Sequence, residues 1–243
     1  MRTLLHIWSF LILLFLALGC SKDKNDCLKS TGEIVFEDRM VQTFKAIRVF
    51  NNVNVIVTQG SAYSVTVEAG SNLQGKITTE VVNDTLVLKN ENKCNWIRSY
   101  KYDINVHVTI VDLTGIEHRG YGDITSTNTI TLDNILFRSV GNGDIYMSID
   151  VDYCYADIHF VGDLQLTGTA DAFGLWHSGS GWIRCESLVA QSVFLDSFSS
   201  GDCFVQVSDE LIATIHEVGS VHYSGSPSLV NLTVNGSGQF YAE

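Results

Sequence analysis

Hydrophobic residues alternate with polar ones through most of the chain after residue 45. Every second position is apolar in the runs 47–49, 53–57, 65–67 and 104–110, where Val and Ile predominate. This period of two is typical of β-strands with one buried face, and Asn, Gly, Asp and Ser stand between the runs, as in turns. No window of helix length repeats its apolar residues at a period of 3.6. The pattern therefore predicts a nearly all-β protein.

Glycine recurs at a nearly constant step in the second half of the chain. The steps are 21, 19, 19, 20, 18 and 19 residues between Gly122, Gly143, Gly162, Gly181, Gly201, Gly219 and Gly238. An apolar residue follows each of these anchor glycines by two positions, and a second one precedes each anchor by six. Stacked coils have this signature, because each coil buries its apolar face only against its neighbours. We predict a single-chain parallel β-solenoid (β-helix) of about 20 residues per coil over 116–243, continuous with a β-rich N-terminal half at 31–115.

The strings around the anchors, such as Gly120-Tyr121-Gly122-Asp123-Ile124, resemble the head GIN domain family. That family is described as putative auto-transporter adhesins and is common in secreted and lipid-anchored proteins of Bacteroidetes-type bacteria. The opening Phe44-x-x-Ile47-x-Val49 and the late Tyr223-Ser224-Gly225-Ser226-Pro227 also resemble it. Three coils lack the first Gly of the string, and the Asp is replaced at Trp182, Ser220 and Gln239. The resemblance implies adhesion at the cell envelope.

The first residues predict export and a lipid anchor. Arg2 precedes an apolar run from Leu4 to Leu18, too short to span a bilayer, which needs about 20 residues. The run ends Ala17-Leu18-Gly19-Cys20, which looks like a bacterial lipobox. We expect a lipoprotein signal peptide at 1–19, acylation of Cys20, a polar tether at 20–30 and an outer-membrane location facing the cell surface or the periplasm. An ordinary signal peptide with an incidental Cys20 is the alternative.

Composition favours a folded, acidic protein. The chain is 45% hydrophobic and contains one Pro, which argues against disorder. Residues 116–243 hold three Arg and no Lys against 16 acids, a net charge of −13. Such a surface repels nucleic acids and other anionic polymers, which are bound mainly through Lys and Arg. We expect no nucleic-acid partner.

Cysteine and histidine do not have metal-binding spacing. Besides Cys20 the chain has an odd number of cysteines, so at least one thiol stays free, and their pairing is open: Cys27, Cys94, Cys154, Cys185 and Cys203. His118 and His177 stand four residues before their anchors, whereas His159 and His216 stand three before, so the two pairs face opposite ways. We predict no cofactor and no zinc site.

Aspartate follows three successive anchors, at Asp123, Asp144 and Asp163. Stacked coils place these carboxylates about 5 Å apart, the strand-pairing distance, and a row of oxygens suits Ca²⁺. Asp after Gly is also common turn chemistry, in which the carboxylate accepts backbone N–H groups. We favour turn chemistry, because the row breaks at Trp182.

Aromatic residues near the anchors form a candidate binding surface. Trp176 lies five residues before its anchor and Trp182 one after, positions that point out of the coil, and Tyr121 and Tyr146 stand near the earlier anchors Gly122 and Gly143. Exposed aromatics offer area for protein or sugar contact at low entropic cost. Packing at the corners against a loop or the N-terminal half is the other open interpretation.

The sequence as a whole predicts a non-catalytic envelope lipoprotein with an adhesin-like or scaffolding surface for protein or glycan. The alternatives are a periplasm-facing component of an envelope complex and a carbohydrate-active β-helix enzyme, for which no catalytic residues are assigned. The chain has no G-x-S-x-G, no H-E-x-x-H and no phosphate-binding loop. Open solenoid ends further predict either caps, from residues 28–45 and Phe240-Tyr241, or a homo-oligomer paired end to end.

Overall fold

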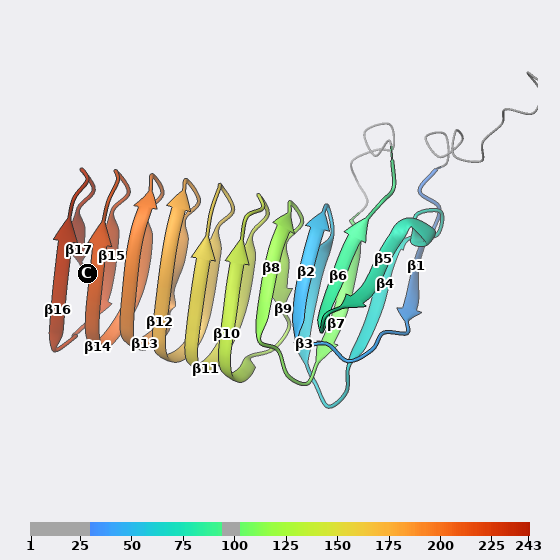
Figure 1. The fold of residues 1–243 in the computed structure, drawn as a ribbon, viewed down its shortest axis with the longest axis horizontal. Helices are drawn as coiled ribbons and strands as arrows, with labels where there is room; N and C mark the ends of the chain where they lie inside the picture. Colours follow the sequence, from blue (N-terminus) through green and yellow to red (C-terminus); the bar gives the residue numbers. More distant parts are fainter. Residues whose placement is uncertain (1–29, 94–102) are drawn as a thin grey trace, which may run out of the picture.

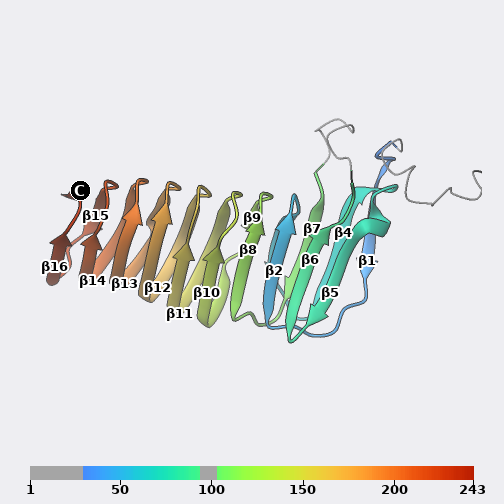
Figure 2. The ribbon, with the colours of Figure 1, turned by 45° about the horizontal axis from the view of Figure 1, so that its top comes forward.

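The computed structural model describes residues 30–93 and 103–243, and these form one long stack of β-strands (Figure 1). The stack stays continuous from its N-terminal to its C-terminal end when the view is turned (Figure 2). The predicted all-β class and parallel solenoid are confirmed. In the part of the chain that is described, no helix has the length and apolar character needed to cross a membrane. The predicted signal peptide, Cys20, Cys27 and Cys94 lie outside the described residues.

Two walls face each other across the core, joined by tight corners at the anchor glycines and by bends on the opposite side. One wall, wall A, is made in spatial order by β5 (Ile77–Val82), β6 (Thr85–Asn90), β2 (Ala46–Asn51), β8 (Gly115–Gly120), β10 (Ile130–Ser139), the second halves of β11 (Ile145–Ile158), β12 (Leu164–Gly179), β13 (Ile183–Ser199) and β14 (Cys203–Ile215), and then β16 (Leu229–Val234). The other, wall B, is made by β1 (Ile34–Arg39), β4 (Ser64–Gly70), β7 (Asn105–Ile110), β3 (Asn54–Gln59), β9 (Ile124–Ser126), the first halves of β11 to β14, and then β15 (Val221–Gly225) and β17 (Phe240–Ala242).

The two apolar ladders expected from the repeat line the inside of these walls. On wall B the paired residues are Ile124, Ile145, Leu164, Ile183, Cys203, Val221 and Phe240. On wall A they are Ile116, Phe137, Ala156, Leu175, Leu195, Ala213 and Leu232. All are buried except Phe240 and Leu232 of the last coil, which are half-buried. The register read from the glycine spacing is therefore confirmed.

The anchor positions must be glycine, because no space is left there for a side chain. A Cβ built on Gly143, Gly162 or Gly181 would run into the backbone carbonyl oxygen of the anchor in the preceding coil, closer than real Cβ atoms approach. None of the seven anchors has a positive φ. Each corner thus rests directly on the backbone of the corner before it, and any side chain would push the coils apart.

The N-terminal half joins the same stack out of chain order. β2 pairs with β6 on one side and β8 on the other, and β3 pairs in the same way with β7 and β9. The first coil in sequence is therefore the second in space, between β6 with β7 and β8 with β9. Ile47 and Ile116 are paired neighbours, although 69 residues separate them in the sequence.

The two ends of the stack differ. At the N-terminal end, β5 covers β6 and β4 covers β7, both antiparallel, and β1 extends beyond β4. Leu73, between β4 and β5, is fully buried there, and β1, which lies within the segment 28–45 expected to form a cap, pairs along the outer edge of β4. At the C-terminal end, Phe240 and Tyr241 lie in β17, which pairs with β15 as one more parallel strand. The expectation that they cap this end is wrong.

Candidate functional site

A stack of rings runs along the outside of wall B near the C-terminal end. We call Trp182, Phe204, His222 and Tyr241 the aromatic column. Successive ring centroids are 5.9, 4.4 and 4.8 Å apart, with interplanar angles of 12°, 15° and 23°. These separations are close to the strand spacing, so the rings lie face to face along the solenoid axis and present their edges to solvent.

Polar groups hold the aromatic column in place. The Arg184 guanidinium lies 5.0 Å from the centroid of the Trp182 ring, as a cation–π contact. The Tyr241 hydroxyl donates to Gln239 Oε1 at 3.0 Å, and His222 Nδ1 lies 2.8 Å from Glu243 Oε1. Trp182 remains 39% exposed and Tyr241 43%. The rings of the aromatic column are therefore held in place, and charged and polar side chains border them.

A second, shorter stack stands on wall A, just before the same corners. We call Trp176, Phe198 and His216 the short column. Its ring centroids are 4.5 and 3.8 Å apart, and His216 Nε2 lies 3.3 Å from Asp196 Oδ1. The two columns thus flank the ridge of anchor glycines, one on each side.

The four aromatic residues singled out from the sequence do not form one cluster. Trp182 begins the aromatic column, and Trp176 begins the short column on the other wall. Tyr146 lies in the outward row of wall B, with Gln165 and Arg184 between it and Phe204. Tyr121 is 63% exposed at a corner.

Sequence reasoning missed the rings that complete the two columns. Phe204, His222 and Tyr241 each stand three residues after an anchor, and Phe198 and His216 each stand three before one. The register that located the inward ladders would also have aligned these outward rows. The spacing from the anchors therefore contains the outward rows as well, although the prediction used it only for the inward positions.

The predicted Asp row forms a ladder of hydrogen bonds between coils. The backbone N–H of Asp144 donates to Asp123 Oδ1 at 3.0 Å, that of Asp163 to Asp144 Oδ1 at 2.8 Å, and that of Trp182 to Asp163 Oδ1 at 2.8 Å. Tyr146 donates its hydroxyl to Asp144 Oδ2 at 2.6 Å, and chiefly this hydrogen bond raises the pKa of Tyr146 to about 12. Over residues 30–93 and 103–243, no group of three or more His, Cys, Asp or Glu side chains could hold a metal ion.

Of the four histidines that stand just before anchor glycines, two point into the core and two point out. His118 and His177 are fully buried, whereas His159 and His216 lie on the surface beside Asp157 and Asp196. His118 Nε2 donates to the carbonyl oxygen of Gly122 at 2.8 Å. Burial lowers the pKa of His177 to about 4. Both core imidazoles are therefore neutral near pH 7.

One core histidine contacts a cysteine. His177 Nδ1 lies 3.1 Å from Cys203 Sγ, and burial raises the pKa of that thiol. The pair is a neutral imidazole beside a thiol, sealed from solvent, so it lacks the thiolate and the access that a nucleophile needs. Cys154 and Cys185 are likewise free and buried.

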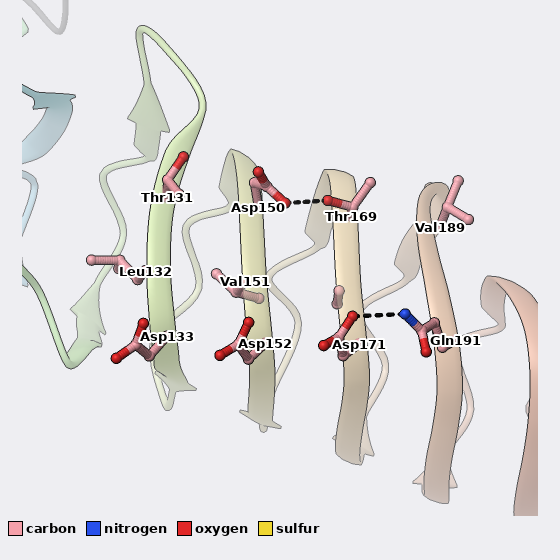
Figure 3. A pocket seen from close by; sticks show the side chains of 11 residues that line it. Thr131, Leu132, Asp133, Asp150, Val151, Asp152, Thr169, Asp171, Val189 and Gln191 are labelled. Atoms are coloured by element: carbon pink, nitrogen blue, oxygen red, sulfur yellow. Dashed lines mark hydrogen bonds between the residues drawn. The ribbon is translucent and has the colours of Figure 1, made fainter.

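A groove of about 400 Å³ follows the bend opposite the anchor corners. Figure 3 shows Asp133, Asp152 and Asp171 side by side along it, on three successive strands. Gln191 donates to Asp171 Oδ1 at 2.8 Å, and Thr169 donates to Asp150. This second acidic row was not singled out from the sequence.

The few basic groups of the repeat region have acidic partners. Arg119 pairs with Glu117, Arg138 with Asp157 and Arg184 with Asp163. The walls of the repeat region consequently offer acidic and aromatic surface for contact.

A family model described as putative auto-transporter adhesin, head GIN domain, matches residues 43–227. A solved structure described as a putative adhesin from Bacteroides fragilis is 25% identical in sequence, with a TM-score of 0.76. The match covers 87% of this chain and 97% of the Bacteroides fragilis chain. A putative lipid binding protein from Parabacteroides distasonis is 19% identical, with a TM-score of 0.68, and covers 88% of this chain and 98% of its own.

A putative adhesin from the same species is 17% identical, with a TM-score of 0.66, and covers 87% of this chain and 98% of its own. Below 25% identity these likenesses show the fold alone. A search of the curated proteins finds no match.

Proposed function

The chain belongs to the family of putative auto-transporter adhesins with a head GIN domain, and on that premise we propose that it is a non-catalytic, adhesin-like binding protein of the cell envelope. In this proposal a lipid on Cys20 holds the protein at the outer membrane, and the solenoid presents its walls to a protein or glycan ligand. The rigid stack suits this role, because side chains on each wall repeat at strand spacing and form an extended platform.

The aromatic column carries the proposal. Its rings are already stacked on one another, so little side-chain entropy remains to be lost when a ligand covers their edges. Ring edges carry partial positive charge and attract carbonyl and hydroxyl oxygens, which proteins and glycans both supply. Arg184, Gln239 and Glu243 border the rings and can add hydrogen bonds.

Protease shaving of intact cells tests the location. An adhesin must face outward, so protease added to whole cells should remove the solenoid, detected with an antibody to residues 103–243. A periplasmic protein of the same membrane serves as the control and should survive. Full protection of the solenoid, with cleavage only after lysis, would contradict adhesion and favour a periplasm-facing component of an envelope complex.

Paired ring deletions test the surface. Trp182→Ala with Phe204→Ala should lower adhesion of cells to a glycan or protein ligand, or binding on an array of them, by about tenfold or more, as expected for deleted aromatic anchors. Trp176→Ala with Phe198→Ala removes equivalent rings on wall A and is the matched control. Equal loss from both pairs, or none from the first, would argue against the aromatic column as the binding surface.

An assay for glycan hydrolysis or lyase activity tests the enzyme alternative. The acidic groove of Figure 3 is where such chemistry would reside, since paired carboxylates cleave glycosidic bonds. We expect no turnover from the wild-type protein. Turnover that Asp152→Asn abolishes would replace the binding role with a catalytic one.

A further inference from the structure

The last coil of the solenoid has an uncovered side. β16 pairs with β14, and β17 pairs with β15. Within residues 30–93 and 103–243, neither β16 nor β17 has a strand partner on its other edge. An edge strand leaves alternate backbone N–H and C=O groups unpaired. Both walls therefore end in a row of free hydrogen-bonding groups.

The core is open at this end as well. Val230 and Val234 of β16 stack on Leu211 and Ile215, which are fully buried. At the same inward positions one coil later, the side chain of Val230 is 43% exposed and that of Val234 is 50% exposed. In Figure 1 no element lies beyond β16 and β17. The apolar interior of the coil meets solvent here.

These two edges lack the features that normally protect an edge strand. β16 and β17 contain no charged residue and no proline, in the strings LVNLTV and FYA. At the opposite end β1 carries Glu37, Asp38 and Arg39, and β5 carries Glu80. Charges on an edge strand oppose pairing with another chain, so their absence favours pairing at the C-terminal end only.

The aromatic column ends at the same edge. Tyr241 is its last ring, and His222 covers one side of that ring at a centroid distance of 4.8 Å. Trp182, Phe204 and His222 each have a ring stacked on the side nearer the C-terminal end, whereas among the described residues no aromatic ring stacks on the outer side of Tyr241. One ring face of Tyr241 is left for a further aromatic.

We propose that two copies of the chain join tail to tail through β16 and β17. A two-fold axis perpendicular to the solenoid axis places β16 antiparallel to β16 of the second copy on wall A. On wall B it places β17 antiparallel to β17 of the second copy. Such an isologous contact pairs the free backbone groups of both walls at once, closes core on core, and brings the two Tyr241 rings together.

A second copy fits this end better than an unrelated partner does. The occupant must present two uncharged edges at the spacing of the two walls, and the C-terminal end of another copy has both. Charge agrees with this choice, because Glu243 is the single acid of residues 219–243 and the other acids of residues 116–243 lie on earlier coils. Tail-to-tail pairing keeps most of that charge apart, and the residual repulsion predicts tighter pairing at high salt.

Light scattering and sedimentation velocity of the full chain, in excess detergent micelles, test the proposal. We expect a particle with twice the mass of one chain, dissociating on dilution and favoured by salt. A mass of one chain at every concentration, in low and high salt alike, would overturn the proposal. Loss of the dimer at high salt would also count against it, because a polar contact between charged surfaces weakens under screening.

Matched variants locate the contact. Val230→Glu should raise the dissociation constant about tenfold or more, because it places like charges across the two-fold axis in an apolar contact. Val82→Glu makes the same change on β5, at the N-terminal end, where Val82 is also half exposed, and should leave the dimer intact. Thr233→Asp, on the outer side of β16, should also raise the dissociation constant, and its side chain does not enter the core. A dimer that survives both β16 variants, or is lost in Val82→Glu, would disprove the tail-to-tail contact.

Discussion

At the N-terminal end, antiparallel strands close the stack, whereas at the C-terminal end β16 and β17 have no strand on their outer edges within the described part of the chain. The closed end depends on residues that occur once. Gln74 is buried between β4 and β5, donates to the carbonyl oxygens of Val35 and Val67 at 3.0 Å each, and accepts from Arg39 at 2.7 Å. One side chain thus ties together β1, β4 and the short 3-10 helix η2 (Gln74–Lys76), which connects β4 of wall B to β5 of wall A.

The open end repeats the chemistry of the coils before it. Val230, Leu232 and Val234 occupy the same inward positions as Leu211, Ala213 and Ile215. A repeat therefore specifies how coils stack and carries no instruction for ending the stack, which needs residues outside the repeat. Comparison of the two ends therefore distinguishes the stability that the repeat provides from the stability that a cap adds.

Leucine truncation should cost much more in the middle of the stack than at its open end. Leu195→Ala leaves a cavity in the closed core and should lower the free energy of unfolding by about 2–5 kcal/mol. Leu232→Ala, two coils later on the same ladder, should cost about 1 kcal/mol, because Leu232 is only half-buried. Denaturant titration at a protein concentration that keeps single copies measures both. Equal losses would contradict the open end.

A methyl group on an anchor glycine should disrupt the stack. The Cβ of Gly181→Ala meets the carbonyl oxygen of Gly162, and overpacking of this kind costs about 1–3 kcal/mol. Gly75→Ala, in the turn of the N-terminal cap, is the control, because a Cβ there meets nothing within 4 Å. Thermal unfolding of the two variants gives the comparison. A Gly181→Ala protein as stable as wild type would mean that the corners are not in direct contact.

The regular part of the fold could be predicted from the sequence. The spacing from Gly122 to Gly238 fixed the register of both ladders, because steric exclusion at the corners permits only glycine there. The insertion of β2 and β3 between later strands could not be predicted, because it pairs Ile47 with Ile116 across 69 residues and no repeat marks it. The sequence left open whether Phe240 and Tyr241 cap the C-terminal end, since their apolar character also suits one more coil, which is what they form.

At the site, single residues were easier to predict than their grouping. Trp176 and Trp182 were correctly expected to point outward, and both are more than a third exposed. They fall on different walls because a corner lies between them, and parity along one strand does not continue through a corner. The partners Phe204 and His222 come from neighbouring coils, so only the alignment of successive coils could have located them.

Acid should weaken the repeat region through His177. Burial holds the pKa of this imidazole at about 4, below its ordinary 6.5, so the unfolded chain binds the proton first as pH falls. Stability is therefore fully present above about pH 6.5 and declines toward pH 4, by about 2 kcal/mol between pH 7.5 and pH 5. Denaturant titrations across this range measure the slope.

The control for this prediction is His177→Leu, which removes the titrating group and should flatten the dependence. Burial also lowers the pKa of His118, so part of the slope should remain. Hydrogen exchange should place the acid-induced loss in β12 to β14 and spare the cap around Gln74, whose core contacts involve no histidine. A slope unchanged in His177→Leu would show that other groups govern the acid sensitivity.

The Asp ladder offers the smallest and most selective test. Asp163→Ala removes the acceptor for the Trp182 N–H and should cost about 1 kcal/mol, since that N–H lies near solvent. Asp163→Asn keeps an oxygen in the same place and should cost less. The chain already contains this exchange, because Asn54 Oδ1 accepts the Asp123 N–H at 3.0 Å on the first rung of the ladder.

Calcium separates a structural ladder from a metal site at the same residues. A ladder that serves only backbone N–H groups gives a melting temperature that does not change with millimolar Ca²⁺, in wild type and in Asp163→Asn alike. A rise in wild type that Asp163→Asn abolishes would mean that the carboxylate charges bind the ion. The row would then be a site and not only a joint between coils, and the uncharged first rung at Asn54 would mark where that site begins.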